Sequence, residues 1–234
     1  MTEAILTAQN GPEILSLDTD VGVPLRVAVW IFDGVEVLDF AGPFEVFGVA
    51  RDARGAFGFE VFTVALEDRP IIARNGLRVL PHLCAADTGR VDILVVPGGF
   101  GSRREMRDEA ALAFVRRVSA EAQATLSVCT GALILGAAGL LQGLAATTHF
   151  GALEELRALD CGEVRPHARV VDNGRILTSA GISAGIDGAL HLVSRYMGAA
   201  RAIETARYMQ YDWSQREVDH GRAPAGQPNR YRPD

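Results

Sequence analysis

The run Thr125-Leu-Ser-Val-Cys-Thr-Gly-Ala-Leu-Ile-Leu135 passes from a strand pattern to a helix pattern with no residues left for a loop. Residues 125–128 are short and largely apolar, as expected of a buried strand. Residues 131–141 form a helix pattern so rich in small and apolar side chains that it must be buried nearly all round. The turn between them falls at Cys129. A strand that turns directly into a helix indicates an α/β fold, with the turn at the carboxyl end of the sheet.

The same alternation continues on both sides of this corner. The segment Arg26-Val-Ala-Val-Trp-Ile-Phe32 is almost continuously apolar, which is typical of a strand buried on both faces of a parallel sheet. A helix is expected to start near Gly42, because Pro43 is tolerable only in a first turn. Further strands are predicted at 59–66, 77–80, 91–96, 169–171 and 175–179, and further helices at 109–122, 151–159, 183–197 and 199–209. This order predicts a doubly wound, mostly parallel sheet sandwiched by helices.

A single α/β domain with an extension at each end is expected. Residues 1–24 mix Thr, Asp, Gly and Pro without periodicity and are interpreted as an N-terminal extension. Residues 25–209 carry all the predicted strands and helices. Residues 210–234 are rich in Arg, Pro and Gly, have no apolar period, and are interpreted as an irregular C-terminal tail.

Composition limits the classes of function. Of 234 residues, 48% are hydrophobic and 22% are charged, as in soluble globular proteins. Because 23 basic and 29 acidic residues leave a net charge of −6, we expect no nucleic-acid partner and no membrane partner. A signal-peptide pattern is absent, so a cytoplasmic location is expected. The cysteines Cys84, Cys129 and Cys161 include no CxxC pair, which fits neither a disulfide framework nor a metal site.

Cys129 is the strongest candidate for chemistry. At a strand-to-helix corner, the small residue Gly131 permits the tight turn of a nucleophile elbow, and the thiol then lies at a helix N-terminus. Free N–H groups and the helix dipole at that end are expected to favour the thiolate, which is the nucleophilic form. The alternative is that Cys129 is only a small core hydrophobe.

Two glycines follow the predicted strand at 91–96. Gly98 and Gly99 allow backbone N–H groups to approach a ligand, and with the N–H of Thr130 they form an expected oxyanion or substrate-binding site beside the sulfur. Alternatively, the glycines only make a tight turn.

Two further side chains could act with the thiol. Asp39 is a carboxylate inside the apolar stretch Val37-Leu-Asp-Phe-Ala-Gly-Pro43, so it needs a partner if buried. It is either an N-cap ahead of Pro43 or an acid that hydrogen-bonds the thiolate and passes a proton to substrate. His149 could support the thiol from outside the immediate site, but a capping or core histidine is an equal alternative.

Six motifs in this order resemble the ThiJ/PfpI family, and more narrowly its isonitrile hydratase branch. They are Leu38-Asp-Phe-Ala-Gly-Pro-Phe-Glu-Val46, Val95-Val-Pro-Gly-Gly99, Ser127-Val-Cys-Thr-Gly-Ala-Leu133, Ala138-Gly-Leu-Leu141, Ala146-Thr-Thr-His149 and Thr178-Ser-Ala-Gly-Ile-Ser-Ala-Gly-Ile-Asp187. The resemblance implies a flavodoxin-like, glutamine amidotransferase-like sandwich that is usually dimeric. It also implies a cysteine-dependent hydratase, a lyase that converts a small isonitrile to an N-substituted formamide without a metal or organic cofactor.

The resemblance assigns roles residue by residue. Cys129 matches the family nucleophile, Asp39 the acid that pairs with it, and Thr130 and Gly99 the backbone donors near the bound group. Protease-like and glyoxalase-like relatives place His directly after the cysteine, whereas Thr130 stands here, which weakens both readings. No histidine is followed two residues later by Glu, so a glutaminase triad is absent.

Two alternatives to an isonitrile hydratase stay open. One is an enzyme of the same family that acts on an aldehyde, because fold and elbow do not select among electrophiles. The other is a non-catalytic sensor or redox-responsive protein, since the same core resembles the sensor half of AraC-type regulators. After Met209 only 25 residues remain, which we expect to be too few for the DNA-reading half of such a regulator.

Overall fold

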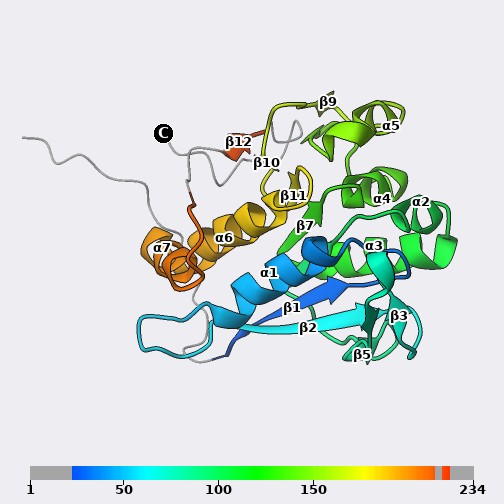
Figure 1. Ribbon diagram of the computed structural model, residues 1–234. Helices are drawn as coiled ribbons and strands as arrows, with labels where there is room; N and C mark the ends of the chain where they lie inside the picture. Colours follow the sequence, from blue (N-terminus) through cyan, green and yellow to red (C-terminus); the bar gives the residue numbers. More distant parts are fainter. Residues whose placement is uncertain (1–22, 214–217, 222–234) are drawn as a thin grey trace, which may run out of the picture.

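An eight-stranded sheet forms the centre of the computed structural model, which describes residues 23–213 and 218–221 (Figure 1). Its strand order is β12-β10-β11-β7-β6-β1-β2-β5. These strands are β1 (Leu25–Trp30), β2 (Phe59–Ala65), β5 (Leu83–Cys84), β6 (Ile93–Val96), β7 (Ala124–Val128), β10 (Val170–Asp172), β11 (Ile176–Ser179) and β12 (Val218–His220). Two small sheets pair β3 (Ile71–Ile72) with β4 (Arg78–Val79) and β8 (Ala145–Ala146) with β9 (Glu163–Val164).

The sheet is mostly parallel, as the sequence predicts. Its pairings from β5 through β11 are all parallel, and only β10 turns back against β11. Every residue of β6 and β7 is buried, which explains why these strands are apolar runs rather than alternating patterns. The carboxyl ends of β6 and β7 are therefore adjacent, and residues that follow them lie together.

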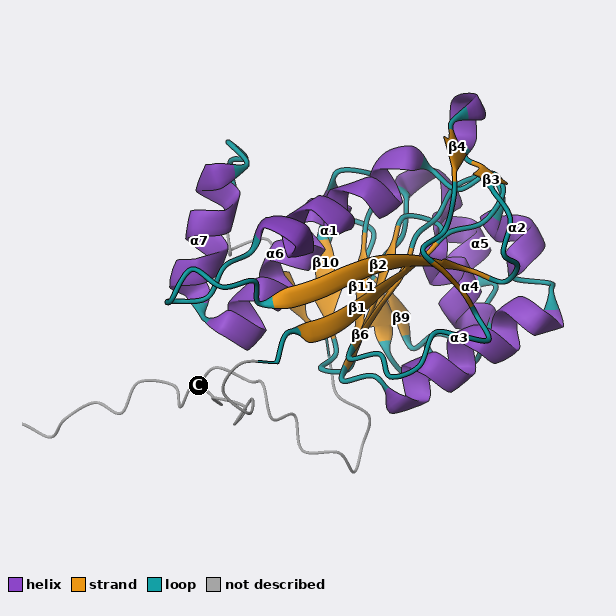
Figure 2. Cartoon of the chain, turned by 90° about the horizontal axis from the view of Figure 1, so that it is seen from below, coloured by secondary structure: helices purple, strands orange, loops and turns teal. Residues whose placement is uncertain are grey.

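Helices cover both faces of the sheet (Figures 1 and 2). On one face lie α1, α6 and α7, and on the other lie α3 and α4. The helices are α1 (Val37–Val49), α2 (Ser102–Glu105), α3 (Glu109–Glu121), α4 (Gly131–Ala137), α5 (Leu153–Arg157), α6 (Ala184–Met197) and α7 (Ala199–Tyr208), with 3-10 segments η1 (Arg74–Gly76) and η2 (Phe150–Ala152). The flavodoxin-like α/β sandwich expected from the sequence is confirmed.

Helix α1 corrects one prediction. It starts at Val37 rather than near Gly42, so Pro43 lies in its interior. Pro43 has no N–H for the carbonyl four residues earlier, a loss worth about 3 kcal/mol in an exposed helix. Burial of apolar side chains such as Phe47 between the sheet and α6 offsets that loss. Asp39 is consequently a first-turn residue and not the N-cap, a position that Glu36 occupies without a side-chain cap bond.

The chain ends differ in part from their predicted character. The interpretation of 210–234 as an irregular tail does not hold for Val218–His220, which pair in parallel with Val170–Asp172 as β12 at the edge of the sheet. Three residues are too few for a periodic apolar pattern to be visible in the sequence. The predicted N-terminal extension lies outside the described residues, except for its last two positions.

Candidate functional site

Three chain segments meet at the carboxyl ends of β6 and β7. Gly98 and Gly99 follow β6, Cys129 follows β7, and Asp39 comes from the first turn of α1. The structure thus brings together the residues that the sequence singled out from positions up to 90 apart, since Gly98 N–H donates to Asp39 Oδ2 at 3.1 Å across 59 positions. His149 reaches the same region from the loop after β8.

The backbone at Cys129 has the strained geometry of an elbow. Its φ is +56°, one of three positive values at non-glycine residues within the described part of the chain. Its N–H donates to the carbonyls of Ser179 and Ala180, both at 3.1 Å, and its carbonyl accepts from Thr148 Oγ1 at 2.7 Å. A side chain at Gly131 would collide with the carbonyl of Val96, which is why the helix that follows can approach β6 so closely.

The protonation state of Cys129 differs from the sequence prediction. The thiol is only 6% exposed, and burial together with the neighbouring charge of Asp39 raises the pKa of Cys129 to about 12. Hydrogen bonds from the N–H and hydroxyl of Thr130 oppose that shift without cancelling it. Helix α4 has seven residues, so its dipole is small compared with the cost of desolvation. The expected preference for thiolate is therefore wrong for the free protein, in which the proton is on sulfur.

Asp39 is fully buried beside the thiol. Burial raises the pKa of Asp39 to about 7, against the opposing effects of the Gly98 N–H and of the Cys129 thiol. The second carboxylate oxygen, Oδ1, is buried and has no well-aligned hydrogen-bond donor among the described residues. The carboxyl group is thus held by one oxygen and is incompletely solvated at the other, which makes it ready to accept a proton near neutral pH.

The two glycines use their N–H groups within the protein. Gly98 donates to Asp39, and Gly99 donates to Thr130 Oγ1 at 2.9 Å. Thr130 is the residue whose backbone N–H reaches the sulfur. Gly99 has φ +120°, and a side chain there would collide with the backbone of Gly34 and Glu36. In the structure both N–H groups are thus bonded to neighbouring side chains, and direct donation to a ligand stays a prediction.

Ser102 is a buried site residue that sequence reasoning missed. Its hydroxyl lies 2.9 Å from Thr130 Oγ1 and 2.7 Å from the carbonyl of Gly99. It stands in the polar stretch Gly101-Ser-Arg-Arg-Glu105, where nothing in the local pattern indicates a buried hydroxyl. Its position three residues after the glycine pair is the one signal that the sequence offers.

A cavity of about 440 Å³ opens above the sulfur. Its lining residues are Glu36, Arg74, Gly99, Phe100, Arg103, Cys129, Thr130, His149, Gly151, Ala152 and Ile182. The Arg74 guanidinium lies 4.2 Å from the centre of the Phe100 ring and 3.5 Å from Glu36, so this wall combines aromatic, cationic and anionic groups. A cavity of this size and mixed lining suits a small organic molecule.

His149 lies on the cavity wall but its ring is oriented by the chain. Nδ1 accepts the N–H of Gly151 at 3.1 Å, which caps η2, and the ring packs on Phe150 with centroids 4.3 Å apart. Because Nδ1 is an acceptor, a neutral ring carries its proton on Nε2. The capping alternative is thus realised, while a catalytic role for His149 stays a prediction.

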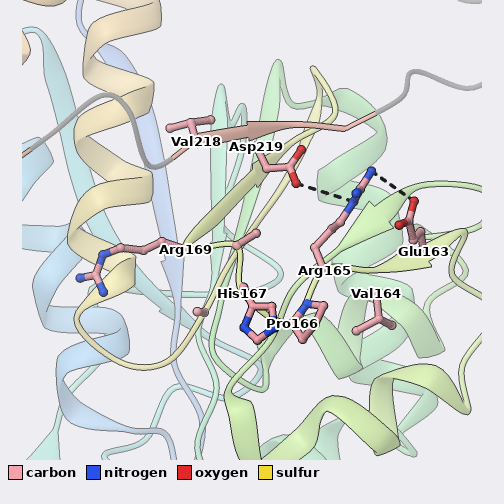
Figure 3. Close-up of a pocket in the computed structure, with 10 residues that line it drawn as sticks. Glu163, Val164, Arg165, Pro166, His167, Arg169, Val218 and Asp219 are labelled. Carbon is pink, nitrogen blue, oxygen red and sulfur yellow. Dashed lines mark ion pairs between the residues drawn. The ribbon is translucent and has the colours of Figure 1, made fainter.

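A second and larger pocket lies between β9 and β12, with a volume of about 840 Å³. Figure 3 shows Arg165 between the carboxylates of Glu163 and Asp219, at 3.1 and 3.6 Å. Arg169 points away from the other labelled residues, toward the α6 residue Asp187, which it contacts at 2.6 Å. No Cys, Ser or Thr is among the described residues that line this pocket, so it offers no thiol or hydroxyl nucleophile.

Comparison with known proteins shows the family of this chain. Residues 25–195 match the DJ-1/PfpI family. The chain belongs to the DJ-1/PfpI family. An isonitrile hydratase from Pseudomonas putida is 38% identical over 186 residues, which are 80% of this chain and 76% of that protein. A ThiJ/PfpI family protein from Pseudomonas syringae has a crystal structure that matches with a TM-score of 0.74 at 30% identity, over 88% of this chain and 82% of that one. The predicted ThiJ/PfpI resemblance is confirmed.

The chain is also similar to part of larger proteins that are transcriptional regulators. The helix-turn-helix transcriptional regulator GbdR from Pseudomonas aeruginosa is 26% identical over 202 residues, which are 86% of this chain and 54% of the regulator. The shared part covers most of this chain, so similarity over this length does not by itself separate enzymes from regulators.

Among residues 23–213 and 218–221, there is no cluster of three or more His, Cys, Asp or Glu side chains that could hold a metal ion. No helix within these ranges is long and apolar enough to cross a bilayer.

Proposed function

We propose that this protein is a cysteine-dependent hydratase that converts a small isonitrile, R–N≡C, to the N-substituted formamide, R–NH–CHO. The observation that carries the proposal is the buried pair of Cys129 and Asp39. The thiol lines the cavity, the carboxyl group is hydrogen-bonded to the thiol, and one carboxylate oxygen lacks a well-aligned donor among the described residues. The similarity to the Pseudomonas putida isonitrile hydratase supports the choice of substrate.

The first step adds the thiol across the terminal carbon of the isonitrile. Asp39, as carboxylate, takes the proton from Cys129 while the sulfur attacks that carbon. The isonitrile carbon accepts both a nucleophile and a proton, so Asp39 then delivers the same proton to it. The product is a thioimidate, R–N=CH–S–Cys129, and Asp39 is again a carboxylate. No proton is exchanged with solvent in this step.

The second step consumes water. Asp39 removes a proton from a water molecule as the oxygen attacks the thioimidate carbon, and then passes that proton to the nitrogen, which gives R–NH–CH(OH)–S–Cys129 and restores the carboxylate. Collapse of this intermediate breaks the C–S bond, returns a proton to sulfur and releases the formamide. The net change is the addition of one water to one isonitrile, which needs no oxidant, reductant or metal.

The neighbouring residues prepare this chemistry. Gly98 fixes Asp39 Oδ2 and leaves Oδ1 for proton transfer. The N–H and hydroxyl of Thr130 stabilise negative charge on the sulfur, and Gly99 orients that hydroxyl through its own N–H. His149 and Ile182, on the cavity wall, contact the substituent R in this proposal.

We also propose that the protein acts as a homodimer in the cytoplasm, with a small molecule as its substrate and no nucleic-acid, membrane, metal or cofactor requirement. The proposed reaction requires no metal or cofactor, because every proton and electron pair in it comes from substrate, water, Cys129 or Asp39. Size-exclusion chromatography with light scattering measures the oligomeric state directly, and a monomer would remove that part of the proposal.

Kinetics with a simple alkyl isonitrile test the reaction. Cys129→Ala should lose at least about 10⁴-fold in kcat because it removes the nucleophile. Cys84→Ser is the matched control, because the hydroxyl can replace the thiol that donates to Asp87 Oδ2 at 2.9 Å, and its rate should be unchanged. One molecule of formamide should form for each molecule of isonitrile consumed. Near-normal formamide production by Cys129→Ala would remove the proposal.

The second candidate is a ligand sensor, favoured by the match to the regulator GbdR over 86% of this chain. A sensor binds a small molecule in the same cavity without turnover. Calorimetric titration with the isonitrile separates the two: a stable complex without formamide supports the sensor, and formamide release supports the hydratase. Assays with methylglyoxal in parallel test whether an aldehyde is the better electrophile.

A further inference from the structure

Ser102 connects the glycine turn to the residue that touches the sulfur. It is the first residue of α2 and is fully buried. Its hydroxyl is 2.7 Å from the carbonyl of Gly99 and 2.9 Å from Thr130 Oγ1, while Thr130 Oγ1 is 3.2 Å from the same carbonyl. The Gly99 N–H donates to Thr130 Oγ1 at 2.9 Å. Two hydroxyl groups and the backbone N–H and carbonyl of Gly99 thus form a closed cluster next to Cys129.

This cluster has fewer protons than contacts. The two hydroxyl groups have one proton each. Four contacts each need a proton to become a hydrogen bond, namely the three O···O contacts and the contact of Thr130 with the sulfur. When Cys129 is a thiol, both protons can be directed at the carbonyl of Gly99. When Cys129 is a thiolate, its negative charge is the stronger acceptor for the Thr130 proton. Thr130 Oγ1 then accepts from Gly99 N–H and can accept a second hydrogen bond from Ser102.

We propose that Ser102 is a positioning residue, whose hydroxyl donates to Thr130 Oγ1 and so turns the Thr130 proton toward the Cys129 sulfur as the thiolate forms. The change requires rotation of two hydroxyl hydrogens and no movement of a heavy atom. Such preorganised donors stabilise a developing charge without a reorganisation cost. A chain of hydrogen bonds also polarises its members, which strengthens the last donor in the chain.

This hydrogen-bond arrangement fits the electrostatics of the site. The thiolate forms in a buried place next to a carboxyl group, and no Lys or Arg is hydrogen-bonded to the sulfur or to Asp39 among the described contacts. Neutral donors are therefore the groups that favour the anion here. The inference concerns the thiolate of Cys129, not the isonitrile, so it can hold or fail independently of the proposed reaction.

Alkylation of Cys129 by iodoacetamide, followed by peptide-resolved mass spectrometry across pH, tests the inference on the full chain. The variants are Ser102→Ala, Thr130→Val and their combination. Ser127→Ala is the matched control, because Ser127 is equally buried, lies two residues before Cys129, and its hydroxyl has no hydrogen-bond partner among the described residues. Resolution by peptide separates Cys129 from Cys84 and Cys161.

Ser102→Ala should slow alkylation of Cys129 about threefold to tenfold and move its pH profile upward, while Ser127→Ala changes the rate less than about twofold. Thr130→Val should slow it further, and adding Ser102→Ala to Thr130→Val should have no additional effect, because Ser102 acts through the Thr130 hydroxyl. A misfolded variant would instead react faster, since an exposed thiol has a lower pKa than the buried one. Equal effects of Ser102→Ala and Ser127→Ala, or independent effects of Ser102→Ala and Thr130→Val, would overturn the inference.

Discussion

Asp39 and Asp172 are both buried carboxyl groups, yet their surroundings shift their pKa values in opposite directions. Asp172 accepts from Nε2 of His191 at 2.7 Å and from the Gly174 N–H at 2.7 Å, and Arg195 lies 3.4 Å away. Burial alone would raise the pKa of Asp172, but His191 and Arg195 outweigh it and the pKa is lowered. For Asp39 burial wins, because a single backbone N–H and a thiol are its partners.

The difference separates a carboxylate that stabilises the fold from one that can exchange a proton near neutral pH. Asp172 joins β10 to α6 and stays charged at all ordinary pH values, so it can hold the sheet edge but cannot exchange protons. Asp39 has a pKa of about 7 and one oxygen without a well-aligned donor, so it can both take up and release a proton. Burial alone therefore does not distinguish the two carboxyl groups, whereas the absence of a cationic hydrogen-bond partner at Asp39 among the described residues does.

The largest expected contrast is in activity. Asp39→Asn keeps an acceptor for the Gly98 N–H but cannot carry a proton, so kcat/KM for an isonitrile should fall about 10³-fold. Asp172→Asn should stay within about threefold of the parent protein, measured at a temperature where both are folded. A comparable loss of activity in the two variants would show that the contrast has no catalytic meaning.

The reverse contrast is expected in stability. Asp172→Ala leaves His191 and Arg195 without their carboxylate in a buried place, so urea unfolding should show a loss of about 3–5 kcal/mol in the free energy of unfolding. Because the pKa of Asp172 is lowered in the folded state, its contribution is present above the unfolded pKa of 3.8 and disappears as pH falls through the folded value. A loss that is the same at pH 2 as at pH 7 would contradict this assignment.

A smaller, pH-dependent gain is expected for Asp39→Asn. The pKa of Asp39 is raised in the folded state, so its favourable contribution is complete below the unfolded pKa of 3.8 and is lost as pH rises through about 7. Above pH 7 the variant avoids burying a charge and should be more stable than the parent protein by on the order of 2–4 kcal/mol. Thermal melts at about pH 4 and pH 8 check this, since the difference should vanish at the lower pH. A gain of equal size at both would mean that ionisation is not its cause.

The central sheet could be predicted because its strands are buried on both faces. The apolar runs at 26–32 and 91–96 leave no alternative to buried strands, and they correspond to β1 and β6. The elbow at Cys129 was predictable for a related reason, since a strand pattern meets a helix pattern there with no residues between them. Helix α1 was less predictable, because tertiary packing keeps Pro43 inside a helix that local rules would end.

Protonation in the site could not be read from sequence. The pKa of Cys129 depends on how deeply the thiol is buried and on the charge of a residue 90 positions away, and neither is a local property. The destinations of the Gly98 and Gly99 N–H groups likewise depend on α1 and α4, which other parts of the chain position. Ser102 was missed because a hydroxyl in a polar stretch looks the same whether it is exposed or buried.

The pH dependence of kcat/KM for an isonitrile tests most directly whether Asp39 and Cys129 work as a pair with one proton between them. In the parent protein, kcat/KM should rise with an apparent pKa of about 7, as Asp39 ionises, and should stay level to at least about pH 9. The residual activity of Asp39→Asn should lack that rise. The same rise in Asp39→Asn, or a parent profile without one between about pH 5 and 9, would contradict the proposed pairing of acid and thiol.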